Sequence, residues 1–100
     1  MNQKTGNGKW ILRLYIAGRT PAARRALANI EAICDQHLRG RCSIEVVDLV
    51  ERPELAERNQ IFAVPTLVRQ LPLPLRKIIG DLSNSEKVIM GLDIELVEQG

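Results

Sequence analysis

The sequence contains few aromatic residues, a single histidine and no long apolar run. One Trp, one Tyr and one Phe are its only aromatic side chains among 100 residues. Because a membrane-spanning helix needs roughly 18 consecutive apolar residues, no transmembrane segment is predicted. Nucleic-acid binding is disfavoured as well, because so few rings are available to stack on bases. No signal-peptide pattern follows the polar start, so the expected location is the cytoplasm.

Catalytic residues are also scarce. Cys34 and Cys42 are the two cysteines; they lie eight residues apart without CxxC spacing, and we interpret them as free structural thiols of a reducing compartment. His37 is the only histidine, and the sequence has no GxxxxGK[ST] phosphate-binding loop. No catalytic residue, metal site or cofactor is therefore predicted, and the chain is not expected to be an enzyme.

The length and composition of the chain are those of one globular domain. A chain of 100 residues with 45% hydrophobic and 26% charged residues has room for one core. We predict a flexible lead-in over residues 1–8 and a domain over residues 9–98. Residues 1–41 carry eight lysines or arginines against two acidic residues, whereas residues 81–100 carry one lysine against five. This asymmetry suits an acidic partner, although a solvated basic helix face explains it equally well.

Hydrophobic patterning predicts a βαβ unit in the first half of the chain. Residues 10–16 form a nearly continuous apolar run, which is typical of a strand at the centre of a sheet. Thr20 as N-cap and Pro21 at the first helical position open a helix that Gly40 closes. A second strand, rich in branched residues, begins at Cys42 and is expected to lie parallel to the first.

The second half predicts a short helix, a hairpin and a last helix. The short helix begins at Pro53, the hairpin pairs residues 66–70 with 75–80, and the last helix runs from a Ser83/Glu86 capping box to about Val97. The resulting order, βαβαββα, resembles that of thioredoxins, and the segment "VPTL" resembles their cis-proline turn. In that family a reactive cysteine lies between the first strand and the first helix, where the helix N-terminus stabilises a thiolate. Here that turn reads "AGRTP", without a cysteine.

Two stretches of the second half fit two secondary structures each. The segment "LPLPLRKIIG", residues 71–80, reads as a hairpin bent at its prolines or as a short helix that begins at Pro74 and ends at Gly80. Residues 88–97 carry a helical apolar stripe, yet residues 90–97 also alternate as a strand would. Such conflict is either the ordinary ambiguity of short apolar segments or the sign of two packings separated by a few kcal/mol.

Five residues are predicted to control such a fold switch: Pro65, Pro72, Pro74, Gly91 and Asp93. The prolines lie in the rearranging region, and a change of X-Pro isomer takes tens of seconds or longer. Gly91 weakens a helix by about 1 kcal/mol relative to alanine, and Asp93 lies toward the unfavourable end of the helix dipole. Replacing Gly91 by alanine is therefore expected to favour the helix, if the site is free of strain.

Taken together, these segments resemble the KaiB family of circadian clock proteins. The matching stretches are "LRLYIAGRTP", "VVDLVERPELAE", "VPTL", "LPLPLRKIIGDLS" and "EKVIMGLD". They occur in this order from about Leu12 to Asp93. The resemblance implies a non-enzymatic protein with two folds, namely a resting tetramer with a βαββααβ order and a thioredoxin-like monomer that binds the KaiC ATPase and antagonises its phosphorylation.

The resemblance also implies partners and a surface that binds them. The resemblance implies KaiA as a further partner. It implies a SasA-like histidine kinase as a competitor for the ATPase. Since a fold without catalysis acts through its surface, we expect the end of the first strand, the second strand and the charged side chains to contact the ATPase. The residues predicted for this surface are Arg25, Asp48, Arg69, Arg76 and Lys77.

Two other functions are compatible with the same residues. The chain is alternatively a KaiB-like stress-response or signalling protein that binds a histidine kinase or another partner through the same surface. A thiol redox or glutathione-binding protein that uses the "VPT" turn is the other alternative. The missing cysteine in "AGRTP" disfavours this last function.

We predict that the protein has no disulfide reductase activity, because the turn before the first helix contains no thiol. Insulin reduction by dithiothreitol should proceed at the same rate with and without the protein. Catalytic turnover that is lost when Cys34 or Cys42 is replaced would show that a thiol mechanism operates after all.

Overall fold

The computed structural model describes residues 9–95, in which four strands lie in the order β2-β1-β3-β4. The strands are β1 (Trp10–Ile16), β2 (Cys42–Asp48), β3 (Thr66–Leu71) and β4 (Arg76–Ile79). β1 pairs in parallel with β2 and antiparallel with β3, and β3 pairs antiparallel with β4. The predicted lead-in, residues 1–8, and the predicted domain end, residues 96–98, lie outside the described residues.

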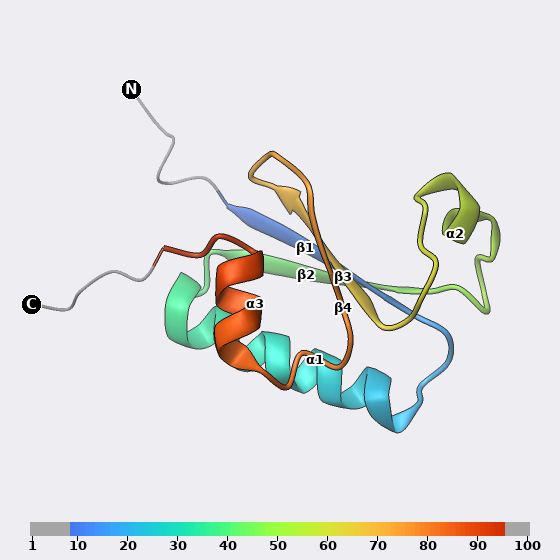
Figure 1. Cartoon of the computed structure of the whole chain (residues 1–100), viewed down its shortest axis with the longest axis horizontal. Helices are drawn as coiled ribbons and strands as arrows, with labels where there is room; N and C mark the ends of the chain where they lie inside the picture. Colours follow the sequence, from blue (N-terminus) through green and yellow to red (C-terminus); the bar gives the residue numbers. More distant parts are fainter. Residues whose placement is uncertain (1–8, 96–100) are drawn as a thin grey trace, which may run out of the picture.

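The helices are α1 (Pro21–Ile33), the π-helical turn η2 (Cys34–Leu38), α2 (Glu54–Arg58) and α3 (Ser85–Gly91). α1 and α3 lie on the same face of the sheet, and α2 lies beyond one end of it (Figure 1). Within residues 9–95, no helix has the length and apolar character that crossing a bilayer requires. The order of strands and α-helices is the thioredoxin-like βαβαββα, as predicted.

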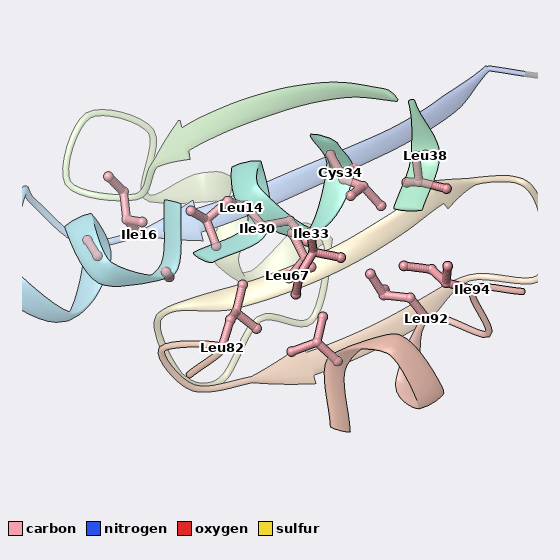
Figure 2. Close-up of a cluster of buried hydrophobic side chains, with 14 residues drawn as sticks. Leu14, Ile16, Ile30, Ile33, Cys34, Leu38, Leu67, Leu82, Leu92 and Ile94 are labelled. Atoms are coloured by element: carbon pink, nitrogen blue, oxygen red, sulfur yellow. The ribbon is translucent and has the colours of Figure 1, made fainter. Parts of the chain in front are cut away.

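β1 lies at the centre of the sheet because its side chains are apolar on both faces. Leu12 and Leu14 are at most 1% exposed and belong to the main core, which α1 and α3 cover. Figure 2 shows Leu14 in this core near Leu67 of β3 and Ile30 of α1. On the opposite face, Tyr15 forms a small cluster with Ile61 and Val68, against which Val47 and Leu49 pack.

α1 begins as predicted and ends differently. The Thr20 side chain accepts the N–H of Ala23 at 3.0 Å, and Pro21 occupies the first helical position. The α-helical part stops at Ile33 and continues as a π-helical turn, so the single helix predicted to reach Gly40 is corrected. Gly40, at φ 77°, then lies in the left-handed turn that leads into β2.

The segment "LPLPLRKIIG" adopts the hairpin rather than the short helix in this structure. β3 and β4 pair from Thr66–Ile79 to Arg69–Arg76, with the proline-rich turn between them. The Val64–Pro65 bond is cis, which confirms the predicted cis-proline turn, and the bonds preceding Pro72 and Pro74 are cis as well.

The start of α3 lies one residue beyond the prediction. Asn84, and not Ser83, is the N-cap, and its Oδ1 accepts the N–H of Lys87 at 3.1 Å. Asp81 Oδ1 accepts the N–H of Ser83, and Leu82 adopts a left-handed conformation that buries its side chain. Ser83 therefore belongs to the turn before the helix, and the predicted Ser83/Glu86 capping box does not form.

The end of α3 is set by Asp93, which corrects the predicted helix to Val97, a residue outside the described range. Asp93 adopts φ 59° and donates its N–H to Met90 O, while Ile94 donates its N–H to Ile89 O. These two bonds form a Schellman motif, in which a left-handed residue closes the helix. Ile94 is buried at the position after Asp93, so its apolar contact supports the turn.

Replacing Gly91 by alanine tests how β4 limits α3. A Cβ atom at residue 91 would lie 2.9 Å from Ile78 Cδ1, so the site is not free of strain. More of the helix gain of about 1 kcal/mol should therefore appear when Cδ1 is removed by Ile78→Val, although Cγ1 at 3.2 Å remains. Urea unfolding of the wild type, both single variants and the double variant should give a favourable coupling free energy. Strict additivity of the two substitutions would contradict the contact.

Candidate functional site

The turn between β1 and α1 faces the cis-proline turn, as in thioredoxin-like folds, but carries no reactive group. Ala17 and Thr20 line a shallow cavity of about 120 Å³ together with Val64 and Pro65. The lining contains no thiol, imidazole or carboxylate. Thr20 supplies a hydroxyl, yet its oxygen already accepts the Ala23 N–H as the cap of α1. This site can present a surface to a partner but has no nucleophile or general base of its own.

Asp48 connects the ends of the two parallel strands. Its Oδ1 accepts the N–H of Gly18 at 3.0 Å and the N–H of Val50 at 2.9 Å. These two hydrogen bonds lower the pKa of the Asp48 carboxyl below its ordinary value, because they stabilise the ionised form. Asp48 therefore holds the loops after β1 and β2 together at neutral pH, next to the turn that carries Arg19.

The edge strand β2 and the adjoining face of α1 form the candidate interface. β2 is the first strand of the sheet order and has no strand partner on its outer side among residues 9–95. Val46 is 39% exposed at its middle and lines a small apolar hollow with Leu27 and Arg24 of α1. An exposed edge with apolar and cationic side chains is the kind of surface to which another chain binds.

Arg25 lies on α1 and faces the segment before α3. Its Nε is 3.1 Å from Asp81 Oδ2, and the Arg25 side chain is 59% exposed. Hydrogen bonds from Ser83, followed by Arg25, lower the pKa of Asp81. Because this ion pair is largely solvated, its contribution to stability is small. More than half of the Arg25 side chain remains exposed and accessible to a partner.

Arg76 and Lys77 point to opposite faces of β4, because side chains alternate along a strand. Lys77 lies on the open face and donates hydrogen bonds from Nζ to Asn59 O at 3.1 Å and Gln60 O at 3.0 Å. It thereby ties the hairpin to the segment after α2. The structure does not gather the predicted charged residues into one patch.

Arg69 is not a surface cation, which corrects one sequence-based expectation. The residue is only 3% exposed, and it stands opposite Leu12 in the register of the central strands. Its guanidinium donates to Leu92 O and to Pro74 O, and it lies 5.3 Å from the centroid of the Trp10 ring. Nε has no hydrogen-bond partner among residues 9–95. Burial lowers the pKa of Arg69, and its visible role is to join β3, the hairpin turn and the end of α3.

Two surface features escaped the sequence analysis. On the open face of the sheet, Tyr15, Gln70 and Lys77 line a pocket of about 250 Å³ together with Arg58 and Gln60 from the segment at the end of α2. The proline-rich turn also exposes three leucines, since Leu71, Leu73 and Leu75 are 43%, 70% and 54% exposed. The second feature could have been predicted from the sequence, because leucines in an expected turn are expected to be exposed there. The pocket depends on how the segment after α2 packs against the sheet. No local sequence pattern predicts that packing.

The chain is similar to one family along nearly its whole length. The KaiB domain model matches residues 13–94. Circadian clock protein KaiB3 from Synechocystis sp. is 49% identical over 84 residues, covering 84% of this chain and 82% of that protein. Circadian clock oscillator protein KaiB from Thermosynechococcus vestitus is 46% identical over 91 residues, covering 91% of this chain and 84% of that protein.

Solved structures with the same fold are more distant in sequence. The N-terminal domain of SasA from Synechococcus elongatus superimposes with a TM-score of 0.72 at 18% identity, covering 100% of this chain and 95% of that domain. Mitochondrial thioredoxin 3 from Saccharomyces cerevisiae has a TM-score of 0.67 at 17% identity, covering 87% and 80%. At this identity the likeness establishes the thioredoxin-like fold alone.

Replacing Arg69 by lysine should destabilise the protein even though the charge is kept. Arg69 reaches the two carbonyls with two different nitrogens, Nη1 and Nη2, whereas lysine has a single nitrogen at its end and no planar group to stack on Trp10. We expect a loss of about 1–3 kcal/mol in the free energy of unfolding, measured with urea. Arg76→Lys, on the exposed neighbouring strand, is the matched control and should change stability by less than about 0.5 kcal/mol. Equal effects of the two substitutions would contradict the structural role of Arg69.

Proposed function

Because the chain belongs to the KaiB family, we propose that it is a non-enzymatic regulatory component of a circadian clock that binds a KaiC-type ATPase. The observation that carries this proposal is the identity of 46–49% with clock proteins over more than four fifths of their length. A site that presents a surface without a nucleophile or general base supports action by binding. The proposed location is the cytoplasm.

The proposed contact surface has two parts. The first is the edge strand β2, which ends at Asp48, with the adjoining face of α1. The second consists of Arg25, which faces Asp81, and of Arg76 and Lys77 on β4 at the opposite edge of the sheet. The partly exposed Val46 supplies an apolar residue in a hollow that Arg24 of α1 and Arg19 of the preceding turn also line. Such a surface suits an acidic partner, and binding would antagonise the phosphorylation of the ATPase. KaiA or a SasA-like histidine kinase is the proposed further partner or competitor.

We also propose that the chain has a second packing, a resting tetramer with βαββααβ order, that differs from residue 51 onward. Seven of the nine exposed large apolar residues lie beyond that position, and four of them are more than 60% exposed: Phe62, Leu73, Ile79 and Met90. A rearranged, assembled form would give these side chains apolar contacts that the monomer lacks. Asp93 supports the proposal because a non-glycine residue in the left-handed conformation makes the end of α3 costly.

Charge reversal tests the ATPase proposal. Arg25→Glu and Arg76→Glu should each lower the affinity for a KaiC-type ATPase by roughly three- to tenfold at low salt, corresponding to about 0.6–1.4 kcal/mol. The effect should shrink as salt screens the charges. Pull-down and titration with and without ATP measure it. Arg52→Glu, which breaks a similarly exposed pair with Glu54 near α2, is the control.

Three results would count against this function. Absence of binding to the ATPase in every nucleotide state contradicts the proposal directly. Binding to a histidine kinase but not to the ATPase favours a signalling protein of the same family instead. Equal loss in the Arg25, Arg76 and Arg52 variants means that the proposed surface is wrong.

NMR tests the second packing. The wild type should show two sets of signals for residues 51–94 in slow exchange, one with helical and one with extended shifts for residues 88–94. Asp93→Gly should raise the population of the helical set, since glycine adopts the left-handed conformation without the side-chain cost of about 1 kcal/mol or more. A single helical set in both proteins at every temperature and concentration would show that the chain has one fold only.

A further inference from the structure

The two cysteines, far from the usual position of a thioredoxin thiol pair, meet where η2 leads into β2. Cys34 is the first residue of η2 and Cys42 the first residue of β2. Their Sγ atoms lie 2.9 Å apart, with both thiols free. Cys34 is buried in the main core, as Figure 2 shows, whereas Cys42 is partly exposed. Cys42 is therefore the more accessible of the two residues.

The backbone between the two cysteines holds this arrangement. The left-handed residues Arg39 and Gly40 reverse the chain after η2. Arg41 donates its N–H to Leu38 O at 2.8 Å, and its own carbonyl accepts the N–H of Trp10 at 2.8 Å. The start of β2 is thereby fixed both to η2 and to the central strand. The distance between the sulfur atoms exceeds the ~2.05 Å of a disulfide by less than about 1 Å, so a small side-chain movement suffices for a bond.

The two thiols have opposite electrostatic surroundings. The Cys34 thiol donates to Cys42 sulfur and thereby lowers the pKa of Cys42, and the positive charge of Lys9 acts in the same direction. The same hydrogen bond, burial and the nearby carboxylates of Asp35 and Glu31 raise the pKa of Cys34. Since the thiolate is the nucleophile in thiol chemistry, Cys42 is the residue that reacts first.

We propose that Cys34 and Cys42 form a reversible dithiol–disulfide site that is oxidised by small disulfides such as glutathione disulfide. The Cys42 thiolate attacks one sulfur of the small disulfide, and the first thiolate leaves as a mixed disulfide forms on Cys42. Cys34, losing its proton to solvent, then attacks Cys42 Sγ and displaces the second thiolate. The two protein thiols are oxidised by two electrons, and one molecule of small disulfide is reduced to two thiols.

This chemistry differs from that of a thioredoxin. The pair lies after the C-terminal end of α1 and not at a helix N-terminus, and the enclosed Cys34 is inaccessible to a folded protein substrate. The site would react once per chain with small molecules, which is compatible with the prediction that the protein does not catalyse insulin reduction. The resulting bond would fasten the first residue of edge strand β2 to the end of the α1–η2 helix.

The test treats the full chain with glutathione disulfide after complete reduction and follows intact mass and free thiols. The wild type should lose the mass of two hydrogen atoms and both titratable thiols, and dithiothreitol should restore them. Cys34→Ser should instead gain the mass of one glutathione on Cys42. Cys42→Ser should react at Cys34 at least roughly tenfold more slowly, because the remaining thiol is buried and has a high pKa. The oxidised wild type should melt about 5–10 °C above the reduced form, while neither serine variant gains stability.

Several results would overturn this assignment. They are a wild type that keeps both thiols, one that carries glutathione on both cysteines, and one that forms dimers linked through Cys42. Faster modification of Cys42→Ser than of Cys34→Ser would reverse the assigned order of attack. An oxidised wild type that melts below the reduced form would show that the bond distorts the fold and is not part of it.

Discussion

The burial of β1 is the constraint on which the rest of the fold depends. Leu12 and Leu14 are at most 1% exposed on one face, and Tyr15 is equally buried on the other. A strand that is apolar on both faces must have a neighbour at each edge and cover above and below. β2 and β3 supply the neighbours, and the parallel pairing of β1 with β2 requires the crossover helix α1. The burial of β1 thereby places β2, α1 and β3.

The C-terminal part, from β3 to the end of α3, is held together by a few individual side chains. Arg69 joins β3 to the hairpin turn and to the end of α3 through two backbone carbonyls. Asp93 closes α3 in a conformation that favours glycine, and a Cβ atom at Gly91 would require the Ile78 side chain to shift. Most of the exposed large apolar side chains also lie in this part. This is the part of the chain that the proposed second packing would rearrange.

The polar side chains near the thioredoxin-like turn form hydrogen bonds with backbone groups of the chain itself. The Thr20 hydroxyl caps α1, and the Asp48 carboxylate accepts two N–H groups from neighbouring loops. Cationic side chains are dispersed over α1 and both faces of β4. This distribution is compatible with the proposed action through an extended surface. The chain belongs to the KaiB family, and the relatives to which it is similar are clock proteins.

Much of the fold and part of the candidate site could be predicted from the sequence alone. The run at residues 10–16, the Thr20–Pro21 helix start and the "VPT" turn are local signals, and the structure has each of them where predicted. These signals work because capping, strand patterning and proline geometry depend on residues close together in the chain. The family could be identified for a related reason, since its motifs are contiguous.

Tertiary structure alone decided the features in which distant segments meet. "LPLPLRKIIG" fits a helix and a hairpin locally, and it becomes a hairpin here because β3 can pair with β1 on its other edge. Arg69 looks like any surface cation in a strand until the hairpin turn and α3 bring two carbonyls and Trp10 around it. The proximity of Cys34 and Cys42 likewise depends on a π-helical turn that no spacing rule indicates. The sequence determined which local conformations were favourable, and the choice among them came from burial and hydrogen bonding between segments remote in the chain.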